Sequence, residues 1–86
     1  MARKIPVEAY VLISVNKDIP SVIRSITEID INKQITEMSL VFGGADIITK
    51  IKIESLQELY NFVLCIIEKI DRVASARTFI INKSEK

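Results

Sequence analysis

QITEMSLVFGGADIITKIKIE (residues 34–54) contains the clearest structural signal in the sequence. Its two halves are rich in residues that favour strands, and Gly43-Gly44 separates them. Glycine takes positive φ without a steric penalty, so a Gly-Gly step between two strand-like runs predicts a hairpin. In the second run isoleucines alternate with lysines, which is the period of a strand with one buried face. We therefore expect two antiparallel strands, over residues 34–42 and 46–54.

On the N-terminal side of this hairpin the pattern changes from strand to helix. The segment VEAYVLISV (residues 7–15) places alternate apolar residues on one face and predicts a strand. In residues 19–30 the isoleucines recur at helical spacing. Pro20 lies where the first turn of a helix tolerates a missing N–H, so we expect an amphipathic helix over residues 19–30.

On the C-terminal side, Ser55 and Glu58 form an S-x-x-E capping box, which predicts the start of a second helix. Phe62 lies at the edge of the expected buried stripe of this helix, and Leu64 lies well outside it. The segment VASARTFIIN (residues 73–82) predicts a last strand. The stripe itself comprises Leu56, Leu59, Tyr60, Val63, Ile66, Ile67 and Ile70.

The resulting order, β-α-β-β-α-β, predicts an α+β domain: a ferredoxin-like βαββαβ sandwich over residues 1–86, with both helices on one face of the sheet. The other face should then be bare, and 49% of this short chain is apolar. Two bare faces packed together would form a dimeric αβ-barrel, and Phe62 and Leu64 would provide a contact between dimers. We expect the bare face to carry Tyr10, Leu12, Met38, Leu40, Ile48 and Ile80.

The bulk composition excludes several classes of partner. The net charge is +1, and acids and bases are interspersed along the chain, which argues against direct DNA binding. No uncharged apolar run approaches the roughly 18 residues of a membrane span. The single cysteine, Cys65, cannot form an internal disulfide and favours a cytoplasmic setting.

The sequence offers little for catalysis. It contains no histidine, and no cluster of residues at metal-ligand spacing is visible. Cys65 has no histidine partner, and the common glycine-rich phosphate-binding motifs are missing. We therefore expect a protein that is not an enzyme and uses neither a cofactor nor a metal.

The turn Gly43-Gly44-Ala45-Asp46 has two interpretations. It can be a tight hairpin in which an aspartate assists the reversal. Alternatively, its glycines can let a ligand approach the backbone N–H groups, with Asp46 pairing an ammonium. The residues alone leave both open.

The stretch from residue 41 to residue 81 resembles the effector-binding domain of Lrp/AsnC transcription regulators. The turn matches through Gly43, Ala45 and Asp46, and the strand at residues 9–15 is similar to the family's first strand. Further matches in the second helix and the last strand are Leu56, Glu58, Leu59, Phe62, Val63, Val73, Thr78, Ile80 and Ile81. The resemblance covers residues 8–82.

The resemblance implies a stand-alone member without a helix-turn-helix domain, forming homodimers that assemble into rings of dimers. It implies an amino-acid-like small molecule bound where dimers meet, near Gly43, Gly44, Asp46 and Thr78. It also implies full-length regulators as further partners. Two residues depart from the family pattern: Arg72 replaces a common glycine, and Ala76 replaces a frequent hydroxyl residue.

Three other functions remain open at this level. The chain could be an assembly partner of full-length regulators that binds no ligand. It could be a small αβ-barrel enzyme of the monooxygenase or isomerase type, although only Tyr10, Lys50 and Asp46 offer polar groups for such a site. It could also be an ACT-type regulatory domain, which pairs its sheets side by side.

Overall fold

The computed structural model describes residues 6–81. Its element order confirms the predicted α+β, ferredoxin-like fold. Asn82, the last residue of the predicted fourth strand, lies outside the described residues. In chain order the elements are β1 (Val7–Val15), α1 (Ile19–Ile29), β2 (Ile35–Leu40), β3 (Ile47–Ile53), α2 (Leu56–Tyr60) with its continuation as the π-helix η1 (Asn61–Ile66) and the 3-10 turn η2 (Ile67–Lys69), and β4 (Val73–Ile80).

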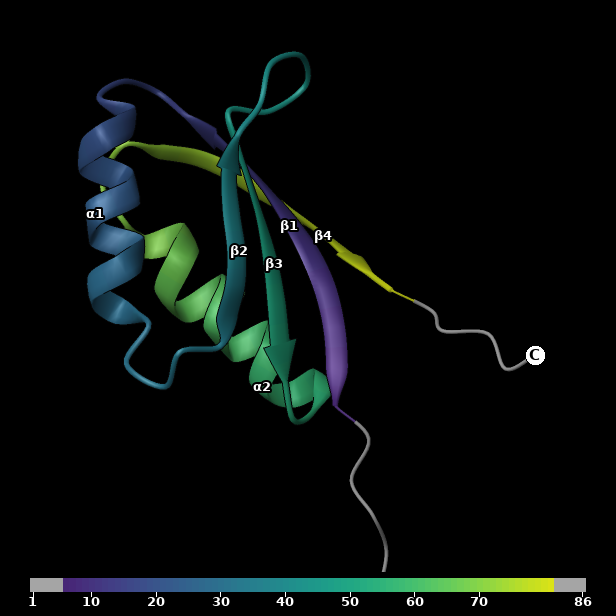
Figure 1. Cartoon of the computed structure of the whole chain (residues 1–86). Coiled ribbons are helices and arrows are strands. Elements are labelled where there is room, and N and C mark those ends of the chain that lie inside the picture. The colour runs from purple at the N-terminus through teal and green to yellow at the C-terminus, as the bar shows by residue number, and fades with distance from the viewer. Residues whose placement is uncertain (1–5, 82–86) are drawn as a thin grey trace, which may run out of the picture.

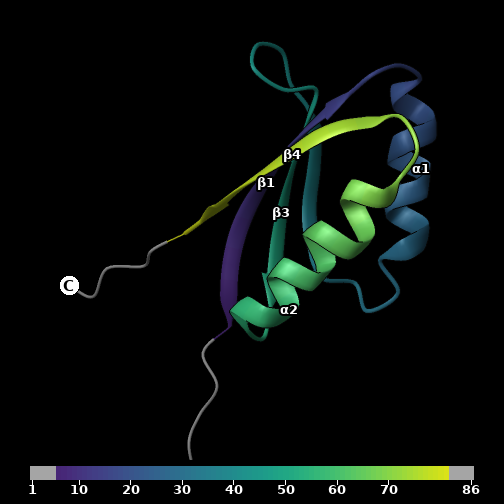
Figure 2. The ribbon, with the colours of Figure 1, turned by 180° about the vertical axis from the view of Figure 1, so that it is seen from behind.

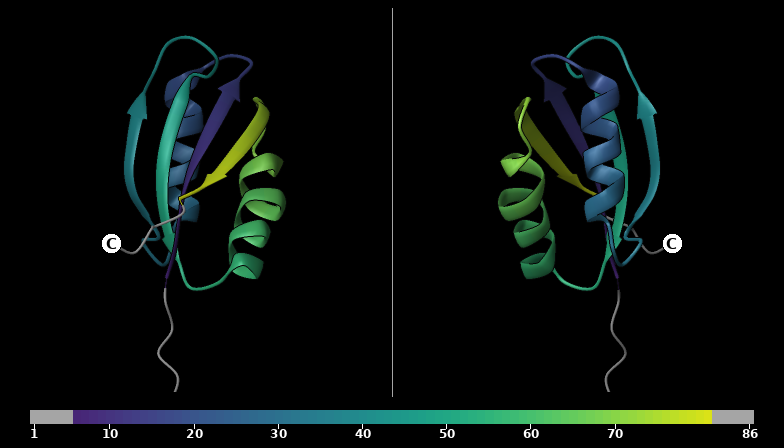
Figure 3. Two further views of the ribbon diagram at one scale, coloured as in Figure 1. Left: turned by 90° about the vertical axis from the view of Figure 1, so that its right-hand side faces the viewer. Right: turned by 90° about the vertical axis from the view of Figure 1, so that its left-hand side faces the viewer.

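The strands form one sheet in the order β2-β3-β1-β4, and each neighbouring pair is antiparallel. Both helices lie on the same side of this sheet, behind it in Figure 1 and in front of it in Figure 2. Seen along the sheet in Figure 3, the molecule has a strand layer and a helix layer. The sheet therefore has a helix-covered face and an open face.

The core lies between the two layers and follows the predicted alternation in β1 and β3. Ala9, Val11 and Ile13 of β1 are fully buried beneath the helices. Because directly opposite residues of an antiparallel pair share a face, their partners in β3 are buried too. The complete buried cluster is Ala9, Val11, Ile13, Val22, Ile26, Ile47, Ile51, Ile53, Leu59, Phe62, Val63 and Ile67.

Side-chain caps begin both helices. The N–H of Glu58 donates to Oγ of Ser55 (3.1 Å), which is one of the two hydrogen bonds of the predicted capping box. Asp18 precedes α1, and its carboxylate accepts from the N–H of Ser21 at 3.3 Å. These contacts satisfy backbone donors that have no partner within the helix.

A bulge in β2 corrects the expected position of Met38 and Leu40. Ile35 lies opposite Ile51, but Glu37 lies opposite Lys50, so one extra residue enters β2 between them. An extra residue reverses the alternation of every side chain that follows it. Met38 therefore packs against the core on the helix-covered face, and Leu40 points to the same face.

The register of β4 against β1 corrects the expected position of Ile80. Ile80 lies opposite the buried Ala9, so it belongs to the helix-covered face, near the end of the sheet. Phe79 lies opposite Tyr10 and takes the position on the open face. Apolar residues occur at both odd and even positions of β4, so the alternation in the sequence alone could not identify which face is open.

The second helix departs from the expected stripe, and its second part is a π-helical segment, η1. A π-turn bonds residue i to i+5 and widens the helix, so the apolar side shifts along the sequence. Phe62 and Val63 are both buried, whereas Leu56, Tyr60 and Ile66 are exposed. Phe62, expected at the edge of the stripe and in a contact between dimers, is instead buried in the core, and the exposure expected of Leu64 is confirmed.

Arg72, which replaces a glycine common in the family, has a backbone conformation that favours glycine. Its φ is 78°, in the left-handed region where glycine is favoured. The carbonyl of Arg72 accepts from the N–H of Asn16 (2.7 Å), which joins the start of β4 to the end of β1. The backbone here has the shape that a glycine would adopt, although an arginine occupies it.

Candidate functional site

The turn between β2 and β3 is held against the end of β1 by Asp46. Its N–H donates to the carbonyl of Ile13 (3.0 Å), and its own carbonyl accepts from the N–H of Val41 (3.0 Å). Its carboxylate Oδ2 accepts from the N–H of Val15 (2.9 Å). Asp46 thus has a structural task, and within residues 6–81 its Oδ1 has no hydrogen bond in the structure.

Arg77 lies beside this turn and was not among the predicted site residues. A Cβ built on Gly44 would lie 3.6 Å from Nη2 of Arg77, so the guanidinium passes close to the glycine backbone. Gly43 has a φ of 115°, which residues with a side chain rarely adopt. The structure therefore places the guanidinium of Arg77 beside the glycine turn, which also contains the carboxylate of Asp46.

Thr78 is not part of this group. It lies opposite Val11 in the β1–β4 pair, so its side chain is on the helix-covered face. Arg77 is opposite Leu12 and points to the other face. Of the four residues expected to bind an effector, the structure gathers Gly43, Gly44 and Asp46, and directs Thr78 away from Arg77.

The open face combines apolar and cationic side chains. Tyr10, Leu12 and Ile48 lie on it, as the sequence indicated, and Phe79 joins them from β4. Nζ of Lys50 is 5.9 Å from the ring centroid of Tyr10, and the guanidinium of Arg77 is 5.9 Å from that of Phe79. Such cation–π contacts hold the charged groups over the rings. We call Tyr10, Leu12, Ile48 and Phe79 the open-face cluster.

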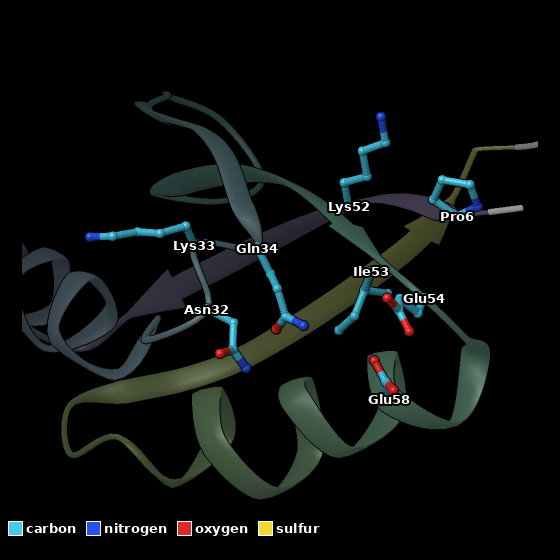
Figure 4. A pocket seen from close by; sticks show the side chains of 8 residues that line it. All are labelled: Pro6, Asn32, Lys33, Gln34, Lys52, Ile53, Glu54 and Glu58. Carbon is cyan, nitrogen blue, oxygen red and sulfur yellow. The ribbon is translucent and has the colours of Figure 1, made fainter. Parts of the chain in front are cut away.

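Three hollows lie at the end of the sheet opposite the turn. The largest, of about 510 Å³, is lined mostly by polar residues from the α1–β2 connection, β3 and α2. Figure 4 shows the side chains that line it, with those of Lys33 and Lys52 directed away from Glu54 and Glu58. A second hollow of about 400 Å³ is mainly apolar, and a third of about 260 Å³ lies against Asn61, Phe62 and Ile66 of η1. None of the three includes Gly43, Gly44 or Asp46 in its lining.

Two further structural facts concern residues 6–81. None of their helices has the length and apolar character needed to span a bilayer. In the same part of the chain, no three His, Cys, Asp or Glu side chains gather as a metal site would require. Cys65 is a free cysteine and is exposed on η1.

A comparison with protein families decides the membership of the chain. The model described as the Lrp/AsnC ligand binding domain matches residues 8–86, nearly the whole length. The chain belongs to this family. A comparison with curated proteins found no match.

Solved structures share the fold of this Lrp/AsnC domain. E. coli AsnC has a TM-score of 0.81 at 24% identity, with 91% of this chain covering 52% of AsnC. A protein from Thermus thermophilus has a TM-score of 0.80 at 21% identity, and the match covers 93% of this chain and 98% of that protein. A feast or famine regulatory protein from M. tuberculosis, complexed with L-methionine, has a TM-score of 0.74 at 16% identity, with 91% and 51% covered.

The Lrp/AsnC domain described here thus spans about half the length of AsnC and almost all of the Thermus thermophilus protein. Its family is one of regulatory ligand-binding domains. Sequence reasoning identified the turn, but it missed Arg77 and Phe79, because only the register of β4 shows which of its residues face outward.

Proposed function

We propose that this Lrp/AsnC ligand-binding domain is a self-associating effector sensor that modulates transcription indirectly. In this function it forms a dimer through the open face of the sheet and binds an amino acid or similar small molecule near the turn at Gly43–Asp46. The work it performs is binding and assembly, with no catalytic step. The setting is the cytoplasm, where an exposed thiol such as Cys65 stays reduced.

The open-face cluster is the observation that carries this proposal. Four large side chains with apolar surface lie on a sheet face that no helix covers. At about 25 cal/mol per Å², burying a few hundred Å² of such surface contributes several kcal/mol to association. A second copy presents the same surface, so a two-fold contact covers both at once.

Leu12→Glu is expected to convert the dimer to a folded monomer. Leu12 lies on the open face, partly buried and flanked across the sheet by Ile48 and Arg77. A carboxylate at the centre of the contact would lose its hydration, so the dissociation constant should rise at least about 30-fold. Light scattering across a dilution series measures the mass, and circular dichroism verifies the fold.

Leu64→Glu is the matched control, because it introduces the same charge on the exposed surface of η1. We propose that Leu64 contributes to contacts between dimers, so this variant should keep the dimer and lose any larger assembly. A wild-type protein that stays monomeric at micromolar concentration would contradict the proposed function. A dimer that survives Leu12→Glu would place the contact elsewhere.

For the ligand, we propose complementary roles for three groups. The guanidinium of Arg77 can bind the α-carboxylate of an amino acid in a bidentate manner. The N–H groups of Gly43 and Gly44 lie in the same region, where a missing Cβ permits close approach. Asp46 can accept from the α-ammonium through Oδ1 while Oδ2 stays bonded to Val15. The L-methionine complex of the M. tuberculosis structural neighbour supports this class of ligand.

A thermal-shift screen of the twenty amino acids tests these roles. At a concentration about 100 times the Kd, a ligand adds about 2.7 kcal/mol of stability, so the Tm should rise by roughly 10–20 °C. Arg77→Leu should abolish the shift, whereas Arg24→Leu on the exposed side of α1 should leave it intact. Asp46→Asn keeps an acceptor for Val15 and should weaken the response without unfolding the domain. A flat screen on a folded oligomer would contradict ligand sensing.

The same open face would also accept the corresponding domain of a full-length regulator. AsnC contains a domain of this fold over about half of its chain, which supports such mixed pairing. In that case the present domain changes the assembly of the regulator, and its effector biases which assembly forms.

A further inference from the structure

Two of the hollows at the end of the sheet form one continuous groove. The hollow of about 510 Å³ and that of about 260 Å³ share four lining residues, which come from the α1–β2 connection, β3 and α2. We call these four residues, Asn32, Gln34, Ile53 and Glu58, the connection groove. Ile53 faces the helix layer and Glu58 belongs to it, so the pairing of open faces proposed above leaves this groove uncovered.

Backbone hydrogen bonds hold the segment that carries the two amide side chains of the groove. The Asp30 carboxylate accepts from the N–H of Gln34 (2.8 Å), and the carbonyl of Gln34 accepts from the N–H of Lys52 in β3 (2.8 Å). Lys33, with a φ of 56°, donates its N–H to the carbonyl of Asp30 (3.1 Å). Figure 4 shows Asn32 and Gln34 extending toward the second helix. This wall is formed without a ligand, so binding requires little reorganisation.

Glu58 provides a carboxylate on the opposite wall of the groove. A complete capping box would bring this carboxylate back to the N–H of Ser55. Within residues 6–81 the structure contains only the other half of the box, from the N–H of Glu58 to Oγ of Ser55, and the carboxylate has no hydrogen bond. It lines both hollows instead, together with the amides of Asn32 and Gln34. Three side chains with oxygen acceptors therefore border one groove.

The floor of the groove is apolar. Ile53 and Phe62 are only 3% and 5% exposed, and they form the base of the smaller hollow. Ile66 of η1 lines the same hollow and is partly exposed. A hydrocarbon chain placed over these residues would lose contact with water, and each buried CH₂ group raises the affinity about fourfold. The groove thus combines a polar end with an apolar end.

We propose that the connection groove binds a primary amine that carries a short apolar chain. An ammonium group has three hydrogen-bond donors, and the groove offers the Glu58 carboxylate and the amide oxygens of Asn32 and Gln34 as acceptors. The chain of the ligand then lies over Ile53 and extends toward Ile66. This site is separate from the one proposed at the glycine turn, which none of the hollows includes.

Two lysines at the rim limit the ligand to one positive charge. Lys33 and Lys52 line the larger hollow, and both side chains are directed away from Glu58 in Figure 4. A second ammonium on the ligand would meet these like charges, whereas a carboxylate would be attracted to them. A monoamine or the corresponding amino acid therefore fits the groove, and a diamine does not.

NMR titration of the isotope-labelled protein tests this specificity. Isoamylamine is the probe, and isovalerate carries the same branched chain on a carboxylate. The amine should shift the side-chain amide signals of Asn32 and Gln34 at millimolar concentration. It should leave those of Asn16 unchanged, because Asn16 follows β1 at the other end of the sheet. Isovalerate and the diamine cadaverine should produce no such shifts, and equal shifts from isovalerate and isoamylamine would overturn the proposal.

Glu58→Gln removes the negative charge and keeps the N–H that Ser55 caps. It should weaken the binding of isoamylamine at least about tenfold. Glu68→Gln is the matched control, because Glu68 is exposed on η2 and lines none of the hollows. It should leave the affinity unchanged. Ile66→Ala shortens the apolar end and should weaken binding roughly fivefold. An unchanged affinity in the Glu58→Gln protein would overturn the proposed role of the groove.

L-Leucine identifies the source of the amine. It is titrated into the Arg77→Leu protein, which lacks the guanidinium of the site proposed at the turn. Shifts of the Asn32 and Gln34 signals by L-leucine would show that the groove accepts amino acids, and shifts by isoamylamine alone would show that it accepts decarboxylated amines. An absence of shifts with both compounds would overturn this inference. It would leave ligand sensing at the turn intact, because that function is tested through Arg77.

Discussion

Replacing Phe62 by alanine is expected to lower the free energy of unfolding by about 3–5 kcal/mol. Phe62 is only 5% exposed and belongs to the buried cluster between the helices and the sheet. Removing its ring leaves a cavity that the neighbouring isoleucines of β1 and β3 cannot fill without moving the sheet. A domain of this length has a free energy of unfolding of roughly 4–13 kcal/mol, so this single substitution removes a large fraction of it.

Urea unfolding followed by far-UV circular dichroism measures this loss. Leu64→Ala is the matched control, two residues further along η1, where the side chain is 53% exposed. It should change the stability by no more than about 0.5 kcal/mol. Both variants must be compared at a concentration that gives the same oligomeric state, because association adds to apparent stability. Equal losses at the two positions would show that η1 does not orient its side chains as described.

Replacing Asp30 by alanine is expected to cost about 3 kcal/mol. The Asp30 carboxylate is buried at the end of α1, where Oδ1 accepts from the N–H of Gln34 (2.8 Å) and Oδ2 from the N–H of Ile35 (3.0 Å). Hydrogen bonds to a charged acceptor are worth about 1.5–3 kcal/mol, and alanine leaves both donors without a partner. The loss also frees the start of β2, where the bulge sets its register.

Two further substitutions test whether the hydrogen bonds of Asp30 cause the expected loss of stability. Asp30→Asn keeps one oxygen acceptor and should lose less than Asp30→Ala. Asp18→Gly removes an exposed cap whose side-chain contact is 3.3 Å long, at a φ of 62° that glycine adopts without strain, so it should cost about 1 kcal/mol or less. Thermal unfolding of the three variants ranks them. If Asp18→Gly proved as damaging as Asp30→Ala, the two buried hydrogen bonds could not be the reason.

The sequence was most informative where one local rule acted alone. The alternation in β1, the capping residue Ser55 and the glycine turn predicted the element order and the helix-covered face correctly. It failed where an irregular backbone feature shifted the pattern. One extra residue in β2 moved Met38 to the core.

The candidate site shows the same division. Gly43, Gly44 and Asp46 stand in one short segment, so their pattern could be recognised. Arg77 and Phe79 depend on which residue of β4 lies opposite which residue of β1. That register results from packing between segments that lie at the two ends of the chain, and no local pattern encodes it.

The π-helical segment η1 also shows where the length of this chain can vary. Successive residues of an α-helix are rotated by about 100° about its axis. A π-turn rotates less per residue, so η1 accommodates about one residue more than a regular helix would over the same rotation. Deleting one residue between Asn61 and Ile66 would therefore restore regular helical winding and keep Ile67 directed at the sheet. In relatives whose second helix is one residue shorter, the alignment gap belongs inside η1.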